Sequence, residues 1–129
     1  KVVLLPGRWQ PLHVGHEWLI QRELDKGKRL VVGIRDTPIT DSDPYSTDIR
    51  KRMIEYRYQD ENVEAWIMPD IEAISYGRKV GYEVREADDI PAEVFAVSAT
   101  EVRSGNRANV SEKVKEFMIN EGLWAEYSS

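Results

Sequence analysis

The chain has no cysteine and only two histidines among its 129 residues. The lack of cysteine excludes disulfides, thiolate metal sites and a cysteine nucleophile, and it fits a reducing compartment, for which we expect the cytoplasm. No apolar run reaches the length of a signal core or a membrane span, so we expect no membrane partner. Acidic residues outnumber basic ones by 23 to 18, and the net charge of −5 argues against a broad nucleic-acid surface. Any phosphate ligand must therefore be met by a local set of residues.

The length predicts one compact domain, spanning residues 1–129, with one site. Short apolar or β-prone runs occur at residues 2–5, 30–34, 63–68, 71–76, 82–85 and 94–97. Helical spacing and capping residues predict helices over 14–28, from Ser46 or Thr47 to about Asp60, from residue 98, and from Asn109 to near Gly122. This alternation predicts an α/β domain with a mainly parallel sheet of about five strands, whose ligands bind at the carboxyl ends of the strands.

Both histidines lie in one segment, GRWQPLHVGH at residues 7–16, around the first strand-to-helix turn. Side chains at positions i and i+3 share one face at the start of a helix. Gly15 between them leaves backbone space for a ligand, and Arg8 precedes them. The structural alternative is a pair of capping or buried, hydrogen-bonded imidazoles. The clustering of both histidines with an arginine favours a functional site at His13 and His16.

A metal site at this pair is the weaker interpretation. Two histidines need further ligands, and the sequence offers no nearby cysteine and no carboxylate at a ligand spacing. We therefore predict no metal held by protein side chains.

A second motif, SATEVR at residues 98–103, follows the β-prone run at 94–97. Ser98 and Glu101 have the spacing of a capping box at a helix start. Such a start offers free N–H groups, hydroxyls and a cation to phosphate oxygens. An ordinary capped helix with a surface arginine is the structural alternative, but the histidine pair upstream favours phosphate binding.

Together the two motifs resemble those of the HxGH nucleotidyltransferase superfamily. His13, Gly15 and His16 match its first signature, and residues 98–103 match its second, a Ser/Thr-rich helix start followed by arginine. The GRWQP run at residues 7–11 is similar to the nicotinamide mononucleotide adenylyltransferases of archaeal type. Further matches at residues 44–50 and 69–70 extend the resemblance over most of the chain. The resemblance implies a Rossmann-like three-layer domain.

The activity that the resemblance implies is transfer of a nucleoside monophosphate, AMP from ATP, to a small phosphorylated acceptor, with release of pyrophosphate. Nicotinamide mononucleotide is one candidate acceptor, and Mg²⁺ is expected on the substrate oxygens with few protein ligands. The catalytic residues implied are His13, His16 and Arg103. The nucleotide-binding residues implied are Gly7, Arg8, Trp9, Gly15, Gly77, Arg78, Ser98, Ala99, Thr100 and Arg103. Our candidates for acceptor binding are Arg35, Asp36 and Arg50.

The chain departs from the family in three places. Ser42 and Asp43 precede a proline where the family usually has a basic residue, and Arg35 and Asp36 stand where glycine and serine are more common. The segment after residues 69–72, which helps to hold a nicotinamide acceptor, is short. The acceptor is therefore left open. Arg35 and Asp36 could equally form a solvated surface pair, and the expected base-recognition loop at residues 76–82 could be a plain tight turn.

Two other functions stay open. A cytidylyltransferase acting on a polyol or choline-type phosphate shares the HxGH signature, but its usual RTxGxST second motif is absent. A nucleotide-binding domain without turnover is the alternative of another class, and the presence of both histidines and of Arg103 argues against it. The sequence determines neither the acceptor nor the oligomeric state, and a homo-oligomer is compatible with it.

Overall fold

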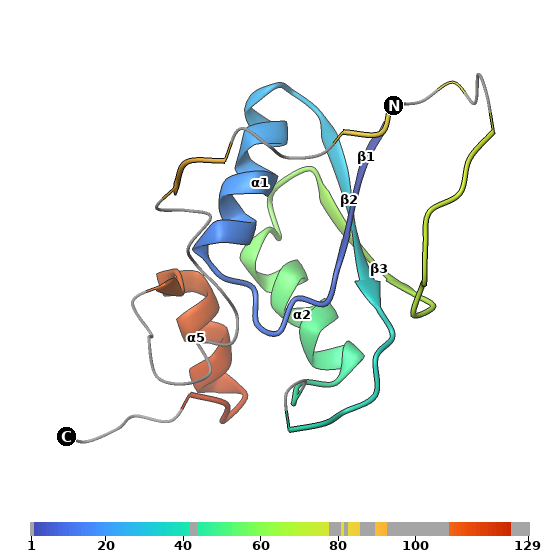
Figure 1. The fold of residues 1–129 in the computed structure, drawn as a ribbon. Helices are drawn as coiled ribbons and strands as arrows, with labels where there is room; N and C mark the ends of the chain where they lie inside the picture. The colour runs from blue at the N-terminus through green and yellow to red at the C-terminus, as the bar shows by residue number, and fades with distance from the viewer. Residues whose placement is uncertain are drawn as a thin grey trace.

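The structure, a computed structural model, describes residues 2–41, 44–77, 81, 83–85, 90–92 and 109–124. In this part of the chain three strands and three helices follow one another in the order β1, α1, β2, α2, β3, α5 (Figure 1). The strands are β1 (Val2–Gly7), β2 (Arg29–Arg35) and β3 (Val63–Met68). The helices are α1 (Val14–Asp25), α2 (Thr47–Arg57) and α5 (Glu112–Asn120). No helix among these residues is long and apolar enough to cross a membrane.

The three strands form one parallel sheet in the order β1-β2-β3. The middle strand β2 is buried from Leu30 to Ile34, as expected for an apolar run with neighbours on both sides. Its register pairs Leu4 with Val31 and Val31 with Glu64, so the carboxyl ends of all three strands lie at one edge of the sheet. The prediction of an α/β domain with a parallel sheet is thereby confirmed.

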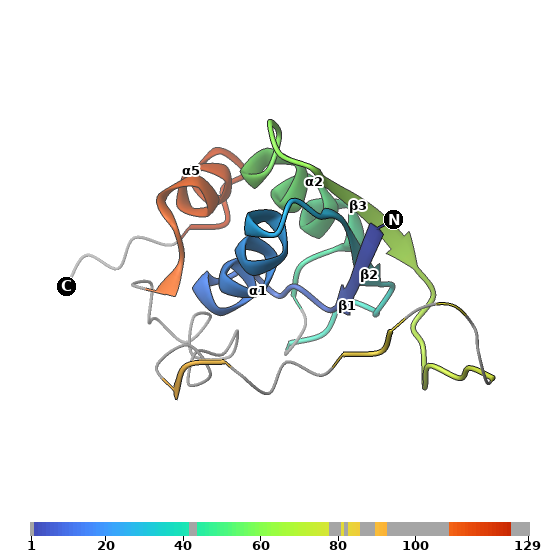
Figure 2. The ribbon, with the colours of Figure 1, turned by 90° about the horizontal axis from the view of Figure 1, so that it is seen from above.

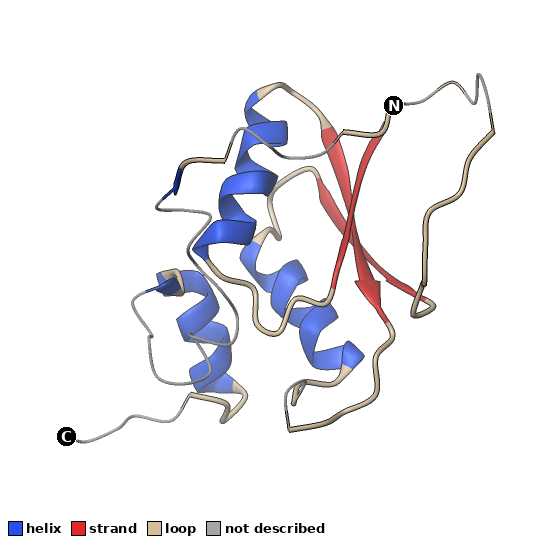
Figure 3. Ribbon diagram, in the orientation of Figure 1, coloured by secondary structure: helices blue, strands red, loops and turns tan. Residues whose placement is uncertain are grey.

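All three helices lie on the same side of the sheet, as Figures 2 and 3 show. The core between these layers is apolar; its buried members from the sheet and from the helices are Leu30, Val32, Ile34, Ala65, Ile20, Met53, Ile54, Val114, Phe117 and Met118. Alternate residues of the strands point to the other face, where Val2, Leu4 and Trp66 are about half exposed. The described part of the chain therefore has two layers.

The helices begin close to where the sequence predicts. Ser46 caps α2, because its Oγ accepts a hydrogen bond from Ile49 N at 3.1 Å, but the helix ends at Arg57, before the expected Asp60. The prediction of Asn109 as the cap of the last helix is wrong, since Ser111 occupies that position. Ser111 makes no side-chain capping bond, because its Oγ donates instead to Glu17 Oε1 of α1 at 2.6 Å. The predicted end near Gly122 is confirmed.

Five strands are not found, since only three form in the described residues. The expected strand at 71–76 is not formed, and of the expected strand at 82–85 the described residues 83–85 have no strand structure. A strand needs a neighbour for its backbone, whereas the carbonyl of Ile71 accepts from the Arg35 side chain at 3.2 Å. Ile74 and Tyr76 are exposed by 57% and 58%, unlike the half-buried pattern of a strand. The expected strand at 94–97 and the helix from residue 98 lie outside the described residues.

Candidate active site

The turn between β1 and α1 is built around the buried indole of Trp9. This residue has a left-handed backbone with φ 58°, and its side chain is only 3% exposed. Its Nε1 donates to the Gly33 carbonyl of β2 at 3.0 Å. A Cβ at Gly7 would lie 3.1 Å from the indole, so glycine is needed there to make room for Trp9. The structure therefore assigns Gly7 and Trp9 to packing beneath the turn.

Gln10 joins the same turn to the loop before α2. Its Nε2 donates to the Tyr45 carbonyl at 3.1 Å, and its Oε1 accepts from Tyr45 N at 3.0 Å. One side-chain amide thus satisfies both backbone groups of Tyr45, as a neighbouring strand would. Sequence reasoning did not include Gln10 in the site, although a polar residue between Trp9 and Pro11 is a detectable signal.

The two histidines cap α1 with their Nδ1 atoms. His13 is the N-cap residue, with extended φ and ψ of −127° and 174°. Its Nδ1 accepts from Gly15 N at 3.1 Å and from His16 N at 3.4 Å. In return, His13 N donates to His16 Nδ1 at 3.4 Å, which completes a capping box made of two imidazoles. The capping role foreseen as the structural alternative is therefore present.

The imidazoles stack on each other beside Trp9. The ring centroids of His13 and His16 are 3.7 Å apart at an interplanar angle of 16°, and Trp9 meets His16 edge-on at 4.5 Å. Burial lowers the pKa of His13 to about 4. Burial, together with the charge that His13 would carry, lowers the pKa of His16 to about 3. Both rings are consequently neutral near pH 7.

Neutral imidazoles with these contacts have a defined tautomer. A neutral ring carries one proton, and an Nδ1 that accepts backbone N–H groups cannot carry it. The proton of each ring is therefore on Nε2. His13 and His16 thus place two Nε2–H donors at the start of α1, next to the carboxyl end of β1, where the helix dipole favours an anion. Such an arrangement is suited to oxyanions such as phosphate.

Arg50, expected near the acceptor, is buried at 0% exposure and donates to backbone carbonyls. Its Nη1 donates to Arg8 O at 2.7 Å and to Arg35 O at 3.0 Å, and its Nε donates to the carbonyls of Tyr45 and Ser46. These contacts make it a structural anchor of the site. Arg8, whose carbonyl it holds, is exposed.

Arg35 and Asp36 lie at the carboxyl end of β2. Arg35 forms an ion pair with Asp70 beyond β3, with Nη2 and Oδ1 2.8 Å apart, and its side chain is 28% exposed. The backbone N–H of the exposed Asp36 donates to Met68 O at 2.8 Å. A charged pair therefore sits at the strand ends, and Asp70 is a member that sequence reasoning did not include.

Of the other expected nucleotide-binding residues, the structure describes only Gly77, and it does not lie at this turn. A Cβ added to Gly77 would meet no atom within 4 Å, and the segment 69–77 runs away from the start of α1 in Figures 1 and 2. The remaining expected residues, Arg78, Ser98, Ala99, Thr100 and Arg103, lie outside the described residues.

Comparisons with known proteins identify no family. No protein-family model matches the sequence, and no curated protein is significantly similar to it. The resemblance to the HxGH superfamily therefore rests on the motifs themselves and on the chemistry of the turn that carries the first of them.

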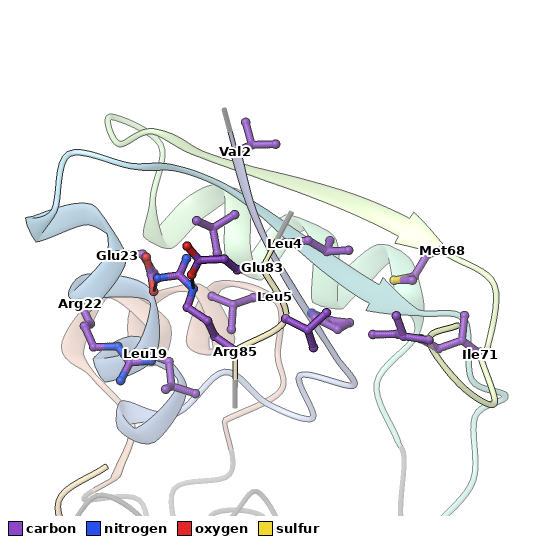
Figure 4. Close-up of a pocket in the computed structure, with 14 residues that line it drawn as sticks. Val2, Leu4, Leu5, Leu19, Arg22, Glu23, Met68, Ile71, Glu83 and Arg85 are labelled. Atoms are coloured by element: carbon purple, nitrogen blue, oxygen red, sulfur yellow. Dashed lines mark ion pairs between the residues drawn. The ribbon is translucent and has the colours of Figure 1, made fainter. Parts of the chain in front are cut away.

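A cavity of about 680 Å³ lies along β1 (Figure 4). Neither His13 nor His16 lines it, and most of its walls are apolar side chains of β1 and of the segment after β3. Its charged members include Glu23, which is 5% exposed and lies 3.7 Å from Arg85. The cavity reaches Pro6 and Met68 near the carboxyl ends of β1 and β3, but its lining is mostly apolar and includes neither histidine of the turn.

Proposed function

We propose that the protein is a nucleotidyltransferase that transfers AMP from ATP to a small phosphorylated acceptor and releases pyrophosphate. The observation that carries this proposal is the pair of stacked, neutral imidazoles at the start of α1, each with its Nδ1 engaged by backbone N–H groups and its proton on Nε2. The resemblance to the HxGH superfamily supports the same assignment. We also propose that the chain folds as a Rossmann-like three-layer domain. In that fold β1, β2 and β3 would be the first three strands of the sheet.

In the proposed reaction, an oxygen of the acceptor phosphate attacks the α-phosphorus of ATP. A new P–O bond forms while the bond from the α-phosphorus to the bridging oxygen breaks, and the electron pair leaves with pyrophosphate. The acceptor phosphate is already ionised near pH 7, so the histidines need not remove a proton. Their low pKa values suit this role, because each Nε2–H donates without a change of charge.

The site contributes orientation and charge stabilisation. His13 and His16 would donate to oxygens of the transferring and leaving phosphates, where negative charge grows in the transition state. Arg8 and Arg103 would neutralise the triphosphate, as the resemblance implies. Arg35 lies at the strand edge where the acceptor phosphate would arrive, with Asp70 orienting its guanidinium.

Magnesium enters through the substrate in this proposal. Among the described residues no three histidine or carboxylate side chains gather as a metal site, so we assign no residue of the chain to the ion. When bound to the triphosphate, Mg²⁺ would reduce its negative charge.

The experiment is to mix the protein with each of the four nucleoside triphosphates, Mg²⁺ and a panel of phosphorylated acceptors, and to follow pyrophosphate. We expect release that requires both ATP and one acceptor class. His16→Ala should lower turnover by about 10²-fold or more with little change in triphosphate affinity, because its donor acts mainly in the transition state. Gln21→Ala is the matched control, since Gln21 lies on the exposed face of α1.

The other outcomes identify the alternatives. Clearly tighter binding and faster turnover of CTP would replace adenylyl by cytidylyl transfer. Triphosphate binding without pyrophosphate release for any acceptor would indicate a non-catalytic nucleotide-binding domain. Unchanged turnover in His16→Ala would remove this histidine from the mechanism.

A further inference from the structure

One guanidinium joins three segments around the candidate site. Arg50 lies on the first turns of α2, and its side chain is completely buried. The carbonyls that it holds belong to the β1–α1 turn at Arg8, the carboxyl end of β2 at Arg35, and the start of α2 at Tyr45 and Ser46. The contacts to Arg8 and Arg35 span 42 and 15 residues of sequence.

These two carbonyls belong to the two sides of the proposed reaction. Arg8 and the histidine pair stand on the triphosphate side, and Arg35 with Asp70 stands at the strand edge proposed for the acceptor. A single nitrogen, Nη1, donates to both carbonyls, at 2.7 and 3.0 Å. One planar group thus bridges the two sides just beyond the last pair of the β1–β2 ladder, Gly7 and Ile34.

We propose that Arg50 is a positioning residue, which sets the distance between the triphosphate and acceptor sides without touching either substrate. This inference rests on the proposed function. The rigid fork of arginine holds Nε and Nη1 at fixed relative positions, whereas lysine is a single point charge on a flexible stem. Arg50→Lys therefore keeps the charge and loses the simultaneous hold on the turn, β2 and α2.

The test compares Arg50→Lys with Arg52→Lys in the full chain. Arg52 lies on the same helix but is 42% exposed, and it pairs with Asp48 and Glu121 at the surface. We expect Arg50→Lys to lower turnover per active site by about tenfold or more, since a shift of about 1 Å in a reacting group can cost about 10²-fold. Active sites are counted by calorimetric ATP binding, which separates misplacement from loss of folded protein. Arg52→Lys should match the unaltered protein.

A second readout follows the turn itself. The four tryptophans give four indole N–H signals in a ¹H–¹⁵N spectrum, and Trp9→Phe assigns the one from Trp9. We expect Arg50→Lys to shift the Trp9 signal, because Trp9 adjoins the Arg8 carbonyl that Arg50 holds. Arg52→Lys should leave it in place. An unmoved Trp9 signal with unchanged turnover per site would overturn the proposal, and so would reduced stability with unchanged turnover per site.

Two further comparisons separate a failure of the positioning role from a failure to fold and from a failure of the proposed function. If Arg50→Lys does not fold, Arg50→Ala is tested with added ethylguanidinium, which should restore folding and turnover together; restored folding without turnover would overturn the proposal. If the unaltered protein transfers no nucleotide while Arg50→Lys still shifts the Trp9 signal, the proposed function fails and the anchoring of the turn stands. The two failures are therefore separable.

Discussion

The stacked histidines predict that the protein loses stability in mild acid, well before its carboxylates titrate. An unfolded histidine has a pKa near 6.5, whereas burial lowers the pKa values of His13 and His16 to about 4 and about 3. As the pH falls below about 6.5, the unfolded chain binds two protons that the folded protein does not. The contribution to stability is therefore complete above the unfolded pKa and is lost as the pH falls toward 4.

The size of the effect follows from these values. Between about pH 7 and about pH 5, each histidine changes the free energy of unfolding by about 1.9 kcal/mol, and the pair by about 3.8 kcal/mol. Within this window the folded rings stay almost unprotonated, so the result depends little on their final pKa values. A loss of this size is a large fraction of the 5 to 15 kcal/mol, roughly, that stabilises a typical domain.

Urea unfolding followed by circular dichroism at several pH values measures this loss. The control is the double variant His13→Asn/His16→Gln, because asparagine at the N-cap and glutamine three residues later can form a capping box without titrating. We expect its stability to be nearly flat over the same range. A loss below about 1 kcal/mol in the unaltered protein, or an equal loss in the double variant, would refute the assignment of the slope to the buried imidazoles.

Three further predictions concern single side chains. Arg103→Ala should raise the apparent KM for ATP, because a charge-assisted phosphate contact already exists in the ground state; equal ATP affinity by titration would remove Arg103 from the site. Gly7→Ala should cost about 1 to 3 kcal/mol in thermal or urea unfolding, because the new Cβ would press on the Trp9 ring, whereas Gly77→Ala should be nearly neutral. Ser46→Ala should cost about 1 kcal/mol by removing the cap of α2, and an unchanged unfolding midpoint would contradict that role.

Local features of the fold were predictable from the sequence. The apolar runs at residues 30–34 and 63–68 became β2 and β3, and Ser46 caps α2 as its residue type indicates. Helix starts depend on hydrogen bonds between residues two or three positions apart, so a short window contains the information. The strand expected at 71–76 does not form, and residues 83–85 of the next expected strand are not in a strand. A strand requires a neighbour, and β-prone composition does not supply one.

The features of the candidate site also divide into those that the sequence predicts and those that depend on the tertiary structure. The sequence by itself placed His13 and His16 together at a helix start, with Arg8 before them, because their spacing is local. Only the tertiary structure decided that the two rings are buried beside Trp9 and stay neutral, since burial depends on β2 and its neighbours. The tertiary structure also shows that Arg50, expected to contact the acceptor, donates to backbone carbonyls of three segments. Arg35 forms an ion pair with Asp70. Parallel strands bring their carboxyl ends to one edge, so residues 35 or 42 positions apart become partners there through a register that no local pattern encodes.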